Sequence, residues 1–110
     1  MSLRSTILAL SILAVSGAAQ AADHPCAADA KEHALQLLLL HTDNDDRSEI
    51  DSQVKVLPSL KNPANAKQRF DVLEVMGYVY KGEYRMRMIY AQMPGSCLLM
   101  GQEILGLASL

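Results

Sequence analysis

The residues with the clearest chemistry are Cys26 and Cys97, the only two cysteines among the 110 residues. Two thiols allow one intramolecular pairing, and an even cysteine count is typical of small exported domains that are stapled by disulfides. Closing a loop of about 72 residues removes unfolded-chain entropy worth roughly 4 kcal/mol. A zinc or redox site would need ligands at close spacing, and the chain has no Cys-x-x-Cys pattern. The sequence therefore predicts a Cys26–Cys97 disulfide.

The three histidines, His24, His33 and His41, do not make a recognisable catalytic or metal-binding set. His33 and His41 are eight residues apart, which is about 12 Å along a helix and too far for one metal ion. No serine lies in a nucleophile motif, and the glycines match no phosphate-binding pattern. We therefore expect no catalytic residue, no bound cofactor and no metal site, in a protein that is not an enzyme.

Two methionines leave one inorganic alternative open. Met86 and Met88 alternate in a segment that we predict to be a strand, which would place two thioethers on one side about 7 Å apart. Soft ligands of this kind select Cu(I). The same face is predicted to be core, where methionine is an ordinary gap filler. A Met-based Cu(I) carrier is therefore kept as an alternative function.

All five aromatic residues lie within residues 70–91, which we predict to form a hairpin of strands 70–80 and 84–91. A two-residue turn at Lys81-Gly82 would sort apolar side chains, including both methionines, onto one face. A three-residue loop with a bulge would exchange the faces of the second strand, and it sorts the residues less well. In the preferred register, tyrosine and arginine, which are enriched at binding hot spots, share the outer face. The predicted interaction face consists of Tyr78, Tyr80, Arg85 and Arg87.

The first 21 residues are typical of a cleaved signal peptide. Arg4 precedes an apolar stretch over residues 7–15, and small residues follow, ending in Ala19-x-Ala21. The apolar stretch is about half of the roughly 20 residues that a membrane-spanning helix needs. We expect a single domain of residues 22–110, periplasmic or secreted, without stable membrane insertion. Cleavage removes one of ten basic residues and leaves twelve acidic ones, so a net charge of −3 argues against a nucleic-acid partner.

Residues 26–41 are predicted to form a helix, with Pro25 at its first turn. The predicted buried side contains Cys26, Ala30, Ala34, Leu37 and Leu38. The leucines of residues 35–40 point in nearly every direction around the axis, so more than one surface should enclose this end. It could be sunk between sheet and loops, or it could form a self-association seam in a homodimer.

The other elements are predicted from local signals. Residues 42–51 form an acidic turn that fails the calcium-loop pattern, and alternation over residues 50–57 indicates a strand that ends at Pro58. Residues 58–67 are predicted to be a loop, and Pro94-Gly95 fits a type II turn. The apolar run from Cys97 has no clean period, and we interpret it as a short strand over 97–100 and a short C-terminal helix over 102–108. The predicted fold class is α+β, with an N-terminal helix packed on a small antiparallel sheet of three to four strands.

The order of these features resembles a group of small secreted or periplasmic proteins of Gram-negative bacteria with no assigned activity. The resemblance rests on the leading segment, the helix with Cys26, the Tyr-Lys-Gly-Glu-Tyr hairpin at 80–84, and Cys97 ahead of Gly-Gln-Glu-Ile-Leu at 101–105. It implies a location and an α+β fold, and it transfers no functional residues. We expect an exported non-enzymatic interaction module with a protein partner that the residues do not identify. It would act through the Tyr/Arg face or the leucine-rich helix end. The alternatives are the Cu(I) carrier and a periplasmic inhibitor or immunity-type protein that uses the acidic residues 43–51.

Overall fold

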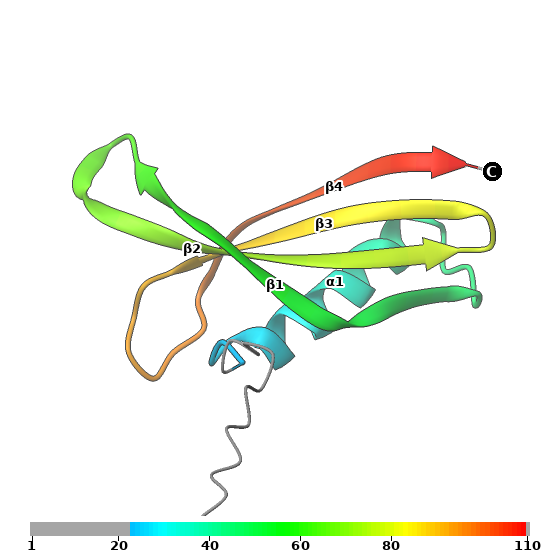
Figure 1. Cartoon of the computed structure of the whole chain (residues 1–110), viewed down its shortest axis with the longest axis horizontal. Helices are drawn as coiled ribbons and strands as arrows, with labels where there is room; N and C mark the ends of the chain where they lie inside the picture. Colours follow the sequence, from blue (N-terminus) through cyan, green and yellow to red (C-terminus); the bar gives the residue numbers. More distant parts are fainter. Residues whose placement is uncertain (1–22, 110) are drawn as a thin grey trace, which may run out of the picture.

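The fold is one helix laid against one face of a four-stranded antiparallel sheet (Figure 1). The computed structural model describes residues 23–109, so the predicted signal peptide lies outside the described residues. Helix α1 spans Ala27–His41, and the strands are β1 Ser48–Asn62, β2 Asn65–Val79, β3 Gly82–Ala91 and β4 Leu99–Ser109. The strands follow chain order across the sheet, which leaves β1 and β4 at its two edges. The α+β class and the N-terminal helix on an antiparallel sheet are confirmed.

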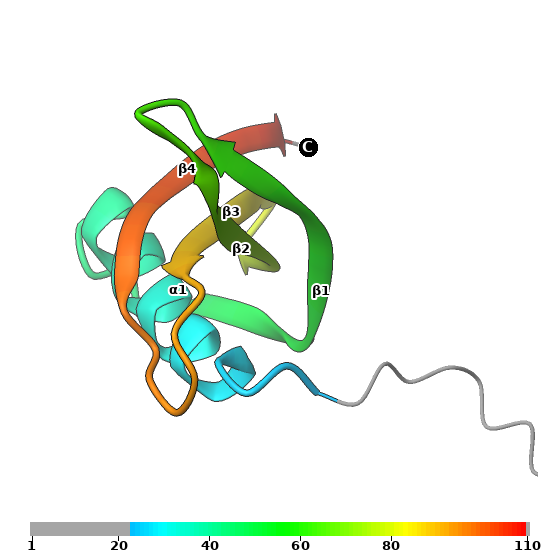
Figure 2. The ribbon, with the colours of Figure 1, turned by 90° about the vertical axis from the view of Figure 1, so that its left-hand side faces the viewer.

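The sheet is longer than the helix that it packs against. The far end of the β1–β2 hairpin projects beyond α1 (Figure 1), and the view along the strands shows how strongly the sheet twists and curls (Figure 2). A long two-stranded ribbon twists more than a broad sheet does, because fewer neighbours restrain it. The helix therefore covers only the part of the sheet that contains the buried core.

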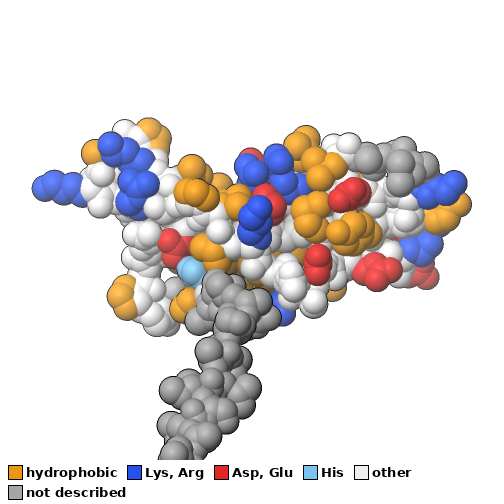
Figure 3. Space-filling view, viewed as in Figure 1, with side chains coloured by type: hydrophobic (Ala, Val, Ile, Leu, Met, Phe, Trp, Pro, Cys, Tyr) orange, Lys and Arg blue, Asp and Glu red, His pale blue; other side chains and the backbone are white. Residues whose placement is uncertain are grey.

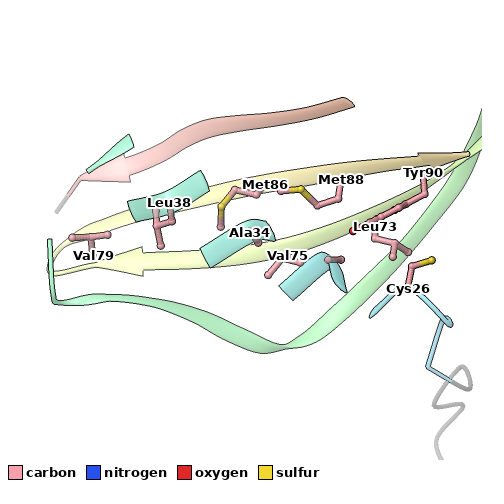
Figure 4. Close-up of a cluster of buried hydrophobic side chains, with 10 residues drawn as sticks. Cys26, Ala34, Leu38, Leu73, Val75, Val79, Met86, Met88 and Tyr90 are labelled. Carbon is pink, nitrogen blue, oxygen red and sulfur yellow. The ribbon is translucent and has the colours of Figure 1, made fainter. Parts of the chain in front are cut away.

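The core comes from the helix and the two central strands. Its buried side chains are supplied by Cys26, by α1, by β2 and by β3, and Figure 4 shows them meeting between the helix and the sheet. These residues are Cys26, Ala30, Ala34, Leu38, Leu73, Val75, Val79, Met86, Met88 and Tyr90. The edge strands add only partly buried side chains, Ile50 and Val54 from β1 and Leu99 and Ile104 from β4. The buried core therefore lies on the two central strands, and the edge strands contribute only to its border.

Small residues bring the helix close to the sheet. Ala30 and Ala34 are fully buried on α1, and Leu38 lies over Gly77 of β2. A Cβ atom at Gly77 would lie 2.9 Å from Leu38 Cδ2 and 2.7 Å from Met86 Cε, so a side chain at this position would overpack the core. The predicted buried side of the helix is confirmed for Cys26, Ala30, Ala34 and Leu38.

The leucine-rich helix end is not sunk between sheet and loops, so that alternative was wrong, while a self-association seam stays a prediction. Leu40 is 78% exposed, while Leu35, Leu37 and Leu39 are only partly buried. Within residues 23–109 the helix packs on a single layer, the sheet, so leucines on its opposite side have no second surface to bury them. The helix end therefore presents apolar surface.

Pro58 does not end the first strand, contrary to the sequence prediction. Strand β1 runs on to Asn62 and is joined to β2 by a tight turn at residues 63–64, so the predicted loop over 58–67 is a hairpin. Leu57 pairs with Val72 and Leu60 pairs with Phe70, so two residues of β1 fall opposite one residue of β2 at Pro58. A bulge on an edge strand is where a sheet tolerates proline, because no partner there needs its missing N–H.

The β2–β3 hairpin has the predicted faces but a different turn. Val79 pairs with Gly82, so the turn residues are Tyr80-Lys81 instead of Lys81-Gly82, and Tyr80 has φ +54°. The shift moves the pairing by two positions, and a two-residue shift leaves every side chain on its original face. Val75 pairs with Met86 and both are buried, which confirms the predicted apolar face.

The C-terminal segment is one strand, so the predicted short helix over residues 102–108 was wrong. Leu99–Ser109 pairs with β3 along its length, from Tyr90↔Leu99 to Gly82↔Ser109. The run has no clean period, so the local sequence did not distinguish strand from helix. Pairing with the free side of β3 favours the strand. Before it, Gly95 has φ +72° and Ser96 N donates to Met93 O at 3.2 Å, which confirms the type II turn at Pro94-Gly95.

Candidate interaction surfaces

The outer face of the sheet, opposite the helix, carries a row of alternating charges. Lys55 pairs with Glu74, Glu74 with Arg87, and Arg87 with Glu103, one residue from each strand in turn. Arg87 Nε donates to Glu74 Oε2 at 3.0 Å, and Arg87 Nη1 lies 3.7 Å from Glu103 Oε1. Opposite charges directly across antiparallel strands stabilise a sheet modestly. Arg87 is therefore occupied by carboxylates of its own chain.

Arg85 lies in the next row and is less well satisfied than Arg87. Its cross-strand neighbours are Met76 on β2 and Leu105 on β4, both apolar. Its Nε is 4.0 Å from Glu74 Oε2, is closed off from solvent, and has no hydrogen-bond partner within the described residues. A buried charged donor without an acceptor is costly. Figure 3 shows charged and hydrophobic side chains interleaved where β3 and β4 lie.

The two tyrosines of the predicted interaction face separate in the structure. Tyr78 lies on the outer face, 39% exposed, and is a diagonal neighbour of Arg85. Tyr80 lies in the hairpin turn, where the Arg47 guanidinium carbon is 4.9 Å and Lys81 Nζ is 5.4 Å from its ring centroid. Cation–π contacts of this kind hold the turn against the loop after α1. The outer face thus unites Tyr78, Arg85 and Arg87, and Tyr80 belongs to a different surface.

The predicted disulfide is present and joins the start of α1 to the segment before β4. The Cys26 and Cys97 Cα atoms are 5.6 Å apart. Beside it lies a cluster that sequence reasoning missed. His24 Nε2 is 2.8 Å from Asp71 Oδ2, Gln92 Nε2 donates to Asp71 Oδ1 at 2.8 Å, and the Cys26 backbone N–H donates to His24 Nδ1 at 3.0 Å. The Gln92 hydrogen bond, reinforced by His24, lowers the pKa of Asp71.

This cluster is suited to anchoring and not to catalysis. Because Nδ1 of His24 accepts a backbone hydrogen bond, the ring proton is on Nε2 and faces Asp71, so neither nitrogen is free to act as a base. An open pocket of about 600 Å³ lies against the disulfide, lined by His24, Asp71 and residues 91–97. No sequence signal connects His24 with Asp71, because they are 47 residues apart and meet only through the fold.

Met86 and Met88 are both fully buried beneath α1, on the core face (Figure 4). Their thioethers pack against hydrophobic side chains, and within residues 23–109 no group of three His, Cys, Asp or Glu residues could hold a metal ion. A Cu(I) ion would have to enter the core to reach these sulfurs. The arrangement therefore matches the gap-filling role of methionine.

The predicted acidic turn is divided between a loop and a strand. Residues 42–47 form the turn, with Asp43 and Asn44 at positive φ, whereas residues 48–51 begin β1. Asp45 is held by Arg47, with Nη2 donating to Oδ2 at 2.7 Å, and this contact lowers the pKa of Asp45 to about 2. One of the three aspartates of this turn is thus engaged within the loop.

Comparison of the chain with protein-family models, with curated proteins and with solved structures found no match in any of the three. The resemblance to small secreted proteins therefore stays a prediction. Among residues 23–109, no helix is long and apolar enough to cross a membrane. The disulfide is compatible with an oxidising, extracellular compartment.

Proposed function

We propose that the protein is an exported, non-enzymatic interaction module that binds a protein partner through the outer sheet face around Arg85. The observation that carries the proposal is the partly exposed Arg85 side chain, whose one ion pair among residues 23–109 is a 4.0 Å contact from Nε to Glu74 Oε2. Met76 and Leu105 flank it, and Tyr78 lies diagonally across. An arginine beside aromatic and apolar side chains is the composition that binding hot spots favour.

This surface also defines the chemistry of the partner. The exposed part of the Arg85 guanidinium can take an oxygen acceptor, and a carboxylate is the best match for it. The apolar side chains around Arg85 would contact apolar side chains that surround this carboxylate on the partner. The partner is therefore a protein surface with an acidic residue set among hydrophobic ones. Export would follow from the predicted signal peptide and from the disulfide.

Affinity capture with an Arg85→Glu variant tests the proposal. The tagged protein is incubated with envelope extract and culture medium, and captured proteins are identified by mass spectrometry and then titrated in purified form. We expect Arg85→Glu to weaken binding of the purified partner by roughly a hundredfold, which is the usual effect of losing a charged hot-spot residue. Arg69→Glu is the matched control, because Arg69 bonds only Ser59 on the projecting hairpin. Equal capture by both variants, or equal loss in both, would overturn the proposal.

A further inference from the structure

We infer that the partner of this surface is a second copy of the chain, joined through antiparallel pairing of β4 with β4. The inference rests on the proposed function, since it names the partner of the Arg85 face. Strand β4 is an edge strand, so one side of its backbone is unpaired. Unpaired N–H and C=O groups along an edge are a template for another strand.

The side chains of β4 leave this edge open. Three of its five large apolar residues, Met100, Leu105 and Leu107, are exposed, and the strand has one charge, Glu103, and no proline. Leu105 is 49% exposed and Leu107 is 45% exposed. Residues 101–106 pair with β3 without a break, so this stretch has the regular backbone that a further strand requires. An open, regular, apolar edge is where sheets associate.

Twofold symmetry restricts the register of such a pair. An axis perpendicular to the sheet preserves its two faces, so it must pass through a residue that pairs with its own copy. An axis at Glu103 would set two carboxylates directly opposite each other, which is destabilising. An axis at Ile104 keeps residues 102–106 within the regular stretch and sets each Glu103 opposite Leu105 of the other copy.

The register centred on Ile104 is also complementary in size and charge. Within the regular stretch it pairs a large residue with a small one, Gln102 with Gly106. It extends the row of Met76, Arg85 and Leu105 by the Glu103 of the second copy, which places a carboxylate in the same row as the Arg85 guanidinium. Ile104, which packs against the core, would meet its own copy at the axis.

The helix end lies near the same part of β4. His41 packs edge-on against the Tyr84 ring at 5.4 Å, and a Cβ atom at Gly106 would lie 3.6 Å from that ring. Tyr84 therefore connects the C-terminal end of α1 with the C-terminal half of β4. The exposed Leu40 adds apolar surface at this end of the molecule.

The test is the mass of the purified, oxidised protein over a range of concentrations, by light scattering and sedimentation. We expect a dimer that Leu105→Glu weakens by roughly tenfold, because the new carboxylate opposes Glu103 of the second copy and occupies Arg85 of its own chain. Since Leu105 is exposed and faces Arg85, this variant retains its fold, and its circular dichroism and melting curve verify that. Val56→Glu is the matched control, because Val56 is 46% exposed on the opposite edge, and it leaves the dimer unchanged.

Cysteine pairs test the register. Oxidation of a mixture of Glu103→Cys and Leu105→Cys proteins should give a covalent heterodimer, while neither variant alone crosslinks efficiently, because directly opposed Cα atoms lie within disulfide range. A monomer at all concentrations would overturn the inference and leave the proposed function standing if capture still depends on Arg85. A dimer that resists Leu105→Glu, or that Val56→Glu disrupts, would overturn the inference as well.

Discussion

The two edges of the sheet differ in charge, in proline content and in the regularity of their pairing. Strand β1 has four charged residues, a proline and three register shifts along its length, whereas β4 has one charge, no proline and two register shifts that flank an unbroken central stretch. Charges, proline and bulges are the means by which proteins keep edge strands from pairing with other chains. The β1 edge is thus protected, and the β4 edge is open.

The difference favours different roles for the two edges. An open, apolar edge carries a risk of aggregation, and a chain that protects one edge so thoroughly has the residues to protect both. The disulfide adds to the contrast, because Cys97 fixes the segment just before β4, while β1 follows a loop without such a link. We propose that β4 is a fixed binding edge and β1 a solvent edge.

The largest effect should come from removing the disulfide. Cys26→Ser/Cys97→Ser should lower the free energy of unfolding by about 4 kcal/mol, because the unfolded chain regains the freedom of a long loop. Denaturant unfolding of the variant and the oxidised parent measures this loss. Amide exchange should increase more in β4 than in β1, since only β4 is held through Cys97. Equal increases in both edges would contradict the contrast.

A smaller effect is expected at the cluster beside the disulfide. Asp71→Asn removes one charge, keeps the shape, and should cost roughly 1 kcal/mol at neutral pH through weaker bonds to Gln92 and His24. The pKa of Asp71 is lowered from 3.8 in the folded protein, so its stabilisation is present above about pH 4 and is lost as the pH falls through the lowered pKa. Melting curves of both proteins should therefore converge in acid. A difference that persists below the lowered pKa would rule out this role.

The smallest effect on stability should come from opening the protected edge. Pro58→Val with Lys55→Val and Lys61→Val changes exposed positions of β1, and we expect unfolding free energy to change by less than about 1 kcal/mol. The variant should nevertheless form assemblies larger than a dimer, because both edges would then be open. Light scattering checks this result. An unchanged mass would mean that the charges and the proline of β1 are not what prevents it from pairing with other chains.

The sequence predicted the features that local chemistry controls. The Cys26–Cys97 pairing followed from count and compartment, the buried side of α1 from periodicity, and the faces of β2 and β3 from the sorting of apolar and charged residues. The turn at Tyr80-Lys81 was missed by one residue, because glycine at position 82 suggested a different centre. The core prediction depended only on the face that each side chain occupies, so the error in the turn left it intact.

The features that were missed depend on contacts distant in sequence. Residues 102–108 became strand because β3 offered a free side, and Pro58 stayed in β1 because a bulge on an edge strand tolerates it. His24 and Asp71 meet only when β2 passes the start of the helix. The candidate Tyr/Arg face was therefore predicted as residue types, while the neighbours that give Arg85 its role came from the fold.

Amide hydrogen exchange at low and high protein concentration tests the central claim most directly, since it reports on both edges of one molecule in one experiment. If β4 is the binding edge, its outward amides gain protection as the concentration rises, while those of β1 exchange at the same rate throughout. Protection of β4 that does not depend on concentration, or a gain that appears in β1, would contradict the claim.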